Sequence, residues 1–158
     1  MKQITANSYA IRMMKHSDAS DCYALWKKAG LSVAPFDREM HELKTLIEKN
    51  PASCFVARCD NQLIGSVIGA YNGRRAWIYH LAVDPHYQCN GIGTQLLKKT
   101  EQALHTLGAT KILLGVSYTN LKTVVFYEHY GYSVMNDAVH MEKNYWKPNR
   151  SMKGGETV

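Results

Sequence analysis

The sequence lacks the long apolar runs of a membrane protein. No stretch of its 158 residues approaches the roughly 18 consecutive apolar residues of a membrane-spanning helix. Its first residues, MKQITANSYAIRMM, contain no apolar segment of the kind found in a secretory signal. Hydrophobic residues make up 46% and charged residues 20% of the chain, which is the composition of a globular protein. We therefore expect a soluble, cytoplasmic protein without a membrane partner.

Paired cysteines and long basic runs are also absent. The cysteines at 22, 54, 59 and 89 form no C-x-x-C pair, and the seven histidines show no H-x-x-x-H spacing, so we expect free thiols and no metal. The formal charge is +6, but basic residues are scattered, and two KK pairs at 27–28 and 98–99 fall on expected helices with an apolar opposite face. This pattern favours solvated helix faces over a nucleic-acid stripe, and it also suits attraction of an anionic cofactor.

The first half of the chain predicts one strand, two helices and then a sheet. A strand is expected at 9–14, followed by a helix that Ser17 caps and Gly30 ends. A second helix is expected to begin at Asp37 as its cap and to end at Asn50. Three strands then form an antiparallel meander with turns at Asp60-Asn61 and Asn72-Gly73, and their expected ranges are 53–59, 62–70 and 75–83.

The second half predicts a crossover. An apolar face at helical spacing runs from Ile92 to Leu107, where Gly108 closes the helix, and an apolar strand follows at 111–117. A strand, a long helix and another strand imply a parallel pair. A short helix at 120–130 that Gly131 ends, and two last strands at 132–135 and 138–145, complete a mixed α/β (α+β) domain over 1–146. Residues 147–158 are expected to be a polar, frayed tail.

The segment QCNGIG at 88–93 places two glycines between a strand and a helix. It is not a P-loop, because no Lys-Ser/Thr follows, and the dinucleotide fingerprint G-x-G-x-x-G/A fits Gly91 and Gly93 but fails at Leu96. Backbone N–H groups at a helix beginning lack carbonyl partners, and the helix dipole adds positive charge. The segment is therefore expected to cradle an anion, with Gly91 and Gly93 leaving room for a pyrophosphate.

Two longer segments resemble one family. LAVDPHYQCNGIGTQLL at 81–97 contains the pattern Q/R-x-x-G-x-G/A and resembles the acetyl-CoA-binding segment of the GCN5-related N-acetyltransferases (GNAT). VSYTNLKTVVFYEHYGY at 116–132 resembles their next strand and helix, in the same order and at the same spacing. The similarity covers roughly 9–145 and is strongest over 75–135. It implies a central, mostly antiparallel sheet of six to seven strands, splayed at the cofactor site and flanked by four helices.

The resemblance also assigns cofactor contacts. Backbone groups of Leu81, Ala82 and Val83 correspond to those that hold the pantetheine arm after a bulge. Asn120 matches a cofactor-binding position, although helix capping alone also accounts for an asparagine there. Cys89 is interpreted as a surface residue of the loop and not as a nucleophile, since the sequence places no base near it. The residues assigned to the pyrophosphate are Gln88, Cys89, Asn90, Gly91, Ile92, Gly93 and Thr94.

The same resemblance points to a direct attack by an amine with Tyr127 as the general acid, because a phenol is protonated at neutral pH and can donate to a departing thiolate. The general base stays open. Some histone-acetylating relatives carry a glutamate six residues before the position of Val83, where this chain has Trp77. Tyr79, His80 or a water relay are the alternatives, and strand alternation is expected to let only one of the two side chains face the cleft.

The acceptor is less defined than the donor. Helices around 25–45 are expected to wall the acceptor cleft, with Phe36, Asp37 and Glu39 placed to meet an amine. The prediction is an acetyl-CoA-dependent N-acetyltransferase, an acyltransferase that acts on a primary amine of a small molecule, a lysine or a protein N-terminus. The rival hypotheses are a non-catalytic acyl-CoA-binding regulatory module and a basic nucleic-acid binder. Relatives are often dimers, and that analogy leaves the oligomeric state open.

Overall fold

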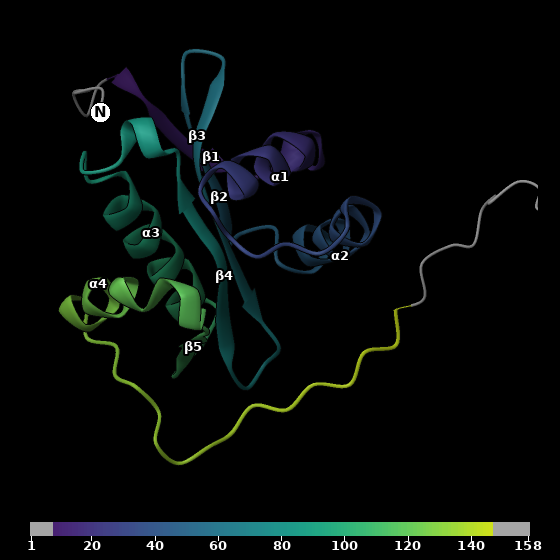
Figure 1. Ribbon diagram of the computed structural model, residues 1–158, viewed down its shortest axis with the longest axis vertical. Helices are drawn as coiled ribbons and strands as arrows, with labels where there is room; N and C mark the ends of the chain where they lie inside the picture. The colour runs from purple at the N-terminus through teal and green to yellow at the C-terminus, as the bar shows by residue number, and fades with distance from the viewer. Residues whose placement is uncertain (1–7, 147–158) are drawn as a thin grey trace, which may run out of the picture. The chain divides into compact units, whose positions relative to one another are not determined.

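A five-stranded sheet organises the computed structural model, which describes residues 8–146 (Figure 1). The chain divides into two compact units, one ending at Leu121 and one beginning at Lys122. The strands follow chain order across the sheet, and each neighbouring pair is antiparallel except the parallel pair of β4 and β5. The predicted meander and crossover are therefore confirmed. The strands are β1 (Ala10–Met13), β2 (Cys54–Cys59), β3 (Gln62–Tyr71), β4 (Ala76–Val83) and β5 (Ile112–Leu114).

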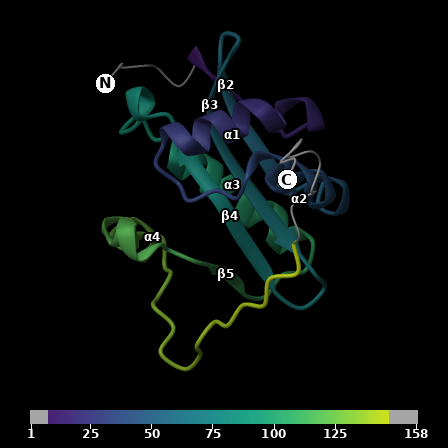
Figure 2. The same cartoon turned by 45° about the vertical axis from the view of Figure 1, so that its right-hand side comes forward.

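Helices cover both faces of this sheet. The helices α1 (Ala19–Lys28) and α2 (Phe36–Lys49) lie on one face, and α3 (Ile92–Thr106) lies on the other (Figure 2). Side chains of α1 and α2 pack on the sheet in one buried cluster, whose largest fully enclosed member is Trp26. On the opposite face, α3 approaches β3 so closely that a Cβ at Gly69 would lie 2.7 Å from Thr100 Cγ2. No helix of the described residues is long and apolar enough to cross a membrane.

Both predicted helix caps are wrong. A 3₁₀ turn, η2 (His16–Asp18), precedes α1, so Ser17 lies inside this turn and Asp18 holds the cap position. The second helix begins at Phe36 after Pro35, whose fixed φ suits a helix entry, and Asp37 lies within its first turn. Acidic and hydroxyl residues are common throughout the first turn of a helix as well as at its N-cap, so residue spacing alone did not show which residue is the N-cap.

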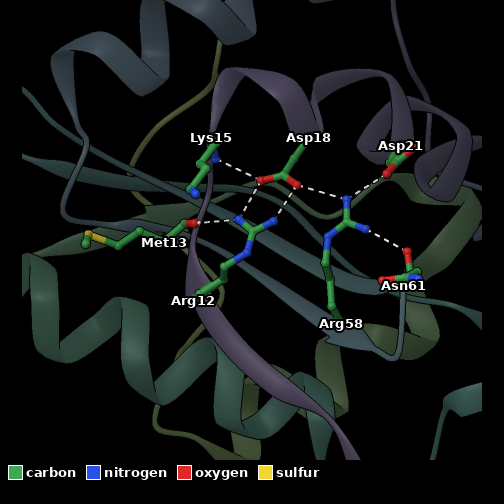
Figure 3. Close-up of polar contacts among 7 residues, drawn as sticks. All are labelled: Arg12, Met13, Lys15, Asp18, Asp21, Arg58 and Asn61. Atoms are coloured by element: carbon green, nitrogen blue, oxygen red, sulfur yellow. Dashed lines mark hydrogen bonds and ion pairs between the residues drawn. The ribbon is translucent and has the colours of Figure 1, made fainter.

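Asp18 instead anchors an ion-pair network that ties α1 to the sheet (Figure 3). Its carboxylate accepts hydrogen bonds from Arg12 at 2.7 and 2.8 Å, from Arg58 at 2.9 Å and from the Lys15 N–H at 2.8 Å. Arg58 also reaches Asp21 at 2.7 Å. Burial raises the pKa of Asp18, but these hydrogen bonds outweigh it and hold the pKa at about 2.

The second unit differs from its prediction. The expected helix at 120–130, which begins at the end of the first unit, is divided into a 3₁₀ segment, η4 (Tyr118–Thr123), with a non-helical kink at Asn120, and α4 (Val124–His129). The two strands expected at 132–135 and 138–145 do not form, so the described residues hold five strands rather than six or seven. Apolar alternation is present there, yet Val139 and Met141 are exposed, and alternation makes a strand only where a partner strand accepts its hydrogen bonds. Residues 147–158 lie outside the described part.

Candidate functional site

A β-bulge near the end of β4 shapes the site. Ile68 of β3 pairs with Tyr79, but Ser66, two residues earlier, pairs with Ala82, three residues later. The extra residue of β4 coincides with a φ of +49° at His80, a left-handed conformation that residues other than glycine rarely adopt. The bulge is buttressed by Ser66, whose hydroxyl donates to the His80 carbonyl at 3.2 Å and accepts from Trp26 Nε1 at 2.8 Å.

Beyond the bulge, one edge of β4 has no strand beside it. The parallel pairing with β5 covers only Ala76, Trp77 and Ile78, and no other strand of the described residues pairs with that edge from Tyr79 to Val83. The sheet therefore opens where the sequence predicted a splay. An extended ligand can add to such an edge through backbone hydrogen bonds, as a further strand would.

The loop after β4 is built by its own hydrogen bonds. Asp84 accepts from the His86 N–H and starts a 3₁₀ turn, η3 (Pro85–Tyr87). The side chain of Gln88 donates to the Val83 carbonyl at 3.1 Å. The side chain of Asn90 donates to the carbonyls of Tyr87 and Gln88, each at 3.0 Å. These contacts fix the loop's course, so Gln88 and Asn90 brace the site in addition to any ligand contact.

The loop leads into the N-terminus of α3, which is suited to bind an anion. Gly91 is the N-cap of α3 with a φ of +76°, and no atom lies within 4 Å of where its Cβ would stand. The Ile92 side chain is buried and anchors the helix start in the core. The first N–H groups of the fifteen-residue helix have no carbonyl partner within it, and its dipole adds positive charge. Cys89 is exposed. Its φ is +62°, and the sequence did not predict this left-handed backbone conformation.

The residues fit an acyl-CoA on two structural counts. The open cradle at Gly91 accommodates a pyrophosphate, and the unpaired edge of β4 after the bulge accommodates an amide-bearing arm. The structure thus places the predicted loop residues and Leu81, Ala82 and Val83 in one continuous stretch of the first unit. Among the described residues, no group of three or more His, Cys, Asp and Glu side chains is arranged for a metal.

The predicted base candidates share one face of the sheet. Tyr79 lies opposite Ile68, which belongs to the cluster under α1 and α2, and the His80 ring stacks on Trp26 of that same cluster at 4.0 Å. Strand alternation was expected to let only one of the two side chains face the cleft, but the bulge breaks the alternation, and both lie on the same face of the sheet. Burial raises the pKa of Tyr79, so its phenol stays protonated at neutral pH and is no base.

Of the three residues predicted to meet an acceptor, only Glu39 is buried against the sheet. Its Oε2 accepts the Ala34 N–H at 2.8 Å, and its Oε1 lies 3.7 Å from His80 Nε2. Phe36 packs edge-on against Tyr23 and stays exposed, as does Asp37. The closeness of Glu39 and His80 was not predicted, since no sequence pattern links the first turn of a helix to a bulge 41 residues later.

Tyr127 belongs to the second unit. It lies on α4, where its ring meets Phe126 and Tyr132 edge-on at 5.2 and 5.6 Å, and Gly131 ends the helix with a φ of +88°. Burial raises the pKa of Tyr127 to about 12. The phenol is therefore protonated throughout the neutral range, as a general acid must be, and its role toward the loop of the first unit stays a prediction.

Comparisons with known proteins agree with this geometry. The model of the acetyltransferase (GNAT) family matches residues 12–132. An acetyltransferase from Sodalis glossinidius is 30% identical over 129 residues, which is 82% of this chain and 89% of that protein. Ard1 from Thermoplasma volcanium aligns with a TM-score of 0.72 at 20% identity over 81% of this chain and 84% of its own. A predicted acetyltransferase from Clostridium acetobutylicum, solved with acetyl-CoA, aligns with a TM-score of 0.68 at 16% identity, over 85% of this chain and 96% of its own.

Proposed function

This chain belongs to the acetyltransferase (GNAT) family, and from that premise we propose that it transfers the acetyl group of acetyl-CoA directly to a primary amine. Family membership supports acetyl transfer and an acyltransferase activity. The observation that carries the proposal of direct transfer from acetyl-CoA is the opening of the sheet at the β4 bulge, followed by a loop that leads into a helix N-terminus open at Gly91. The acceptor is an amine of a small molecule, a lysine or a protein N-terminus.

The chain's own groups divide the task. Backbone groups of the 88–94 loop bind the pyrophosphate, and backbone groups of Leu81, Ala82 and Val83 hold the pantetheine arm. Bound acetyl-CoA supplies an acetyl group activated as a thioester. Tyr127, protonated at neutral pH, donates a proton to the sulfur that leaves. Asn120 contacts the coenzyme, and the side chains of Gln88 and Asn90 hold the 88–94 loop in place beside it.

The experiment is a thiol-release assay with acetyl-CoA and a panel of amines, comprising a tripeptide with a free N-terminus, Nα-acetyl-lysine amide and small aliphatic amines. We expect CoA release that depends on the amine, with a matching acetylated amine by mass spectrometry. Binding of acetyl-CoA without any acetylated product would support the non-catalytic acyl-CoA-binding module instead. Retention on DNA that falls with salt and is unaffected by CoA would support a nucleic-acid binder.

A further inference from the structure

Two titratable side chains from different elements meet beside the β4 bulge. Glu39 Oε1 and His80 Nε2 lie 3.7 Å apart, which is too far for a hydrogen bond between them. Among the described residues, no hydrogen bond involves either of these two atoms. The cap contact of α2 uses the other Glu39 oxygen, which accepts the Ala34 N–H, and the bulge uses the His80 carbonyl, which accepts from Ser66.

The His80 ring is held in place with one nitrogen available. Its plane stacks on the fully buried Trp26 at 4.0 Å with 14° between the rings, and its backbone holds a strained φ of +49°. The side chain keeps 21% of its surface exposed, while Nδ1 is enclosed and finds no hydrogen-bond partner among the described residues. Nε2, on the side of Glu39, is therefore the ring nitrogen left for a ligand.

The surroundings set the charges of this pair. Burial lowers the pKa of His80 to about 4, which Glu42 of α2 partly opposes. Burial raises the pKa of Glu39, as does Glu42, whereas the Ala34 N–H and Arg38 lower it. From α1 and β3 the pair meets Trp26 and Ser66, which do not titrate near neutral pH. His80 is thus neutral at pH 7, and its approach to Glu39 is not an ion pair there.

We propose that Glu39 Oε1 and His80 Nε2 together bind the nitrogen of the acceptor amine and take up the proton that it loses. With the ring proton of neutral His80 on Nδ1, His80 Nε2 and Glu39 Oε1 are two acceptors 3.7 Å apart, and both lie within hydrogen-bond reach of one nitrogen placed between them. The nitrogen forms its bond to the acetyl carbon as the carbon–sulfur bond breaks and the sulfur keeps that electron pair. Before this attack the ammonium gives one proton to the Glu39–His80 pair, which frees the nitrogen lone pair; after it the nitrogen loses its second proton to water, and the sulfur takes the proton of Tyr127. This role rests on the proposed acetyl transfer.

The pair also predicts a preference for amines over hydroxyls. A carboxylate with no cation bonded to Oε1 favours a partner that brings positive charge, and hydrogen bonds to charged groups are stronger than those between neutral ones. An amine that arrives as an ammonium ion offers several N–H donors, so it satisfies both acceptors at once. A hydroxyl has a single donor and no charge, so it leaves one of them without a partner.

The first test needs no turnover. Ethylamine, which carries only the recognised group, is titrated into ¹⁵N-histidine-labelled protein with and without CoA, and the His80 ring nitrogens are followed by NMR. We expect a saturable shift at His80, and in Glu39→Gln an affinity about tenfold weaker. Glutamine still offers an oxygen to the Ala34 N–H, so its melting temperature should match that of the control Glu48→Gln, which changes an exposed residue of the same helix. If the His80 signal does not shift, the proposed binding of the amine by Glu39 and His80 is wrong.

The second test uses turnover. His80→Asn keeps a residue that tolerates positive φ and removes the basic ring, so kcat should fall about 100-fold with an unchanged KM for acetyl-CoA. The ratio of wild-type to variant kcat should shrink as pH rises, because hydroxide can then take the proton, and the ionisation of the amine cancels in this ratio. A kcat equal to that of the control His105→Gln, an exposed histidine of α3, contradicts the role. If the wild type acetylates no amine, the proposed function fails. The ethylamine titration then still tests whether Glu39 and His80 bind an amine.

Discussion

Replacing Tyr127 with phenylalanine is expected to lower kcat for acetyl transfer by about 100-fold without changing the affinity for acetyl-CoA. The pKa of this phenol, raised by burial to about 12, keeps it protonated wherever the enzyme works. Phenylalanine preserves the ring and its edge-on contacts with Phe126 and Tyr132, so the variant loses only the hydroxyl proton. Steady-state thiol release gives kcat, and calorimetry gives the affinity.

The matched control is Tyr145→Phe, which removes a hydroxyl from an exposed tyrosine of the same unit. We expect its kcat to equal that of wild type. If Tyr127→Phe behaved like this control, the assignment of the general acid would be wrong. A loss confined to the KM for acetyl-CoA would also contradict it, because that pattern indicates ground-state binding rather than proton donation.

Replacing Asp18 with alanine is expected to lower the free energy of unfolding by about 3 kcal/mol. The Asp18 side chain is 2% exposed and is the shared partner of Arg12, Arg58 and the Lys15 N–H (Figure 3). Alanine leaves the two guanidinium groups facing each other without the carboxylate between them. Water reaches both arginines, whose side chains are 38% and 22% exposed, so the effect stays at the lower end for a broken ion pair. Urea unfolding followed by circular dichroism measures it.

Asp21→Ala serves as the control for Asp18→Ala. It also removes a carboxylate from Arg58, but the Asp21 side chain is 55% exposed, and such a pair contributes less than about 1 kcal/mol. If both variants lost the same free energy of unfolding, the burial of Asp18 would add nothing to the stability of its ion pairs.

The same network predicts how stability depends on pH. The folded pKa of Asp18, about 2, lies below the ordinary value of 3.8, so its contribution is fully present above that value and is lost as the pH falls through about 2. This contribution amounts to roughly 2 kcal/mol. Asp18→Asn, which does not titrate, should lack this part of the acid destabilisation. An acid unfolding profile identical to that of wild type would contradict the assignment.

Much of the sheet and the loop was predictable because local chemistry decides them. The Asn72-Gly73 turn, the alternation of β2 to β4 and the glycines at 91 and 108 each require a particular backbone course, and the structure follows it. The helix caps and the last two strands were not predictable, since they depend on long-range partners. Asp18 is drawn to Arg58, forty residues away, and the segment after Gly131 has no strand to pair with among the described residues.

The site shows the same limit. Gly91 and its loop were predicted from a local pattern with a physical reason, whereas the bulge at His80 leaves no mark in the sequence, because a histidine with positive φ looks like any other strand residue. Alternation therefore misplaced the side chains of Tyr79 and His80. The pairing of His80 with Glu39 could not be predicted either, because only the tertiary fold brings Glu39 of α2 within 3.7 Å of His80 on β4.

The most direct measurement of the central claim is calorimetric titration of acetyl-CoA into wild type, Gly91→Ala and Gly30→Ala. The two glycines have φ values of +76° and +77°, and neither has an atom within 4 Å of its Cβ position, so alanine strains the backbone equally. Both variants should lose about 1 kcal/mol of stability, but only Gly91→Ala should lose affinity, by about tenfold or more. Equal affinities in all three proteins, or no binding by wild type, would contradict a coenzyme site at the beginning of α3.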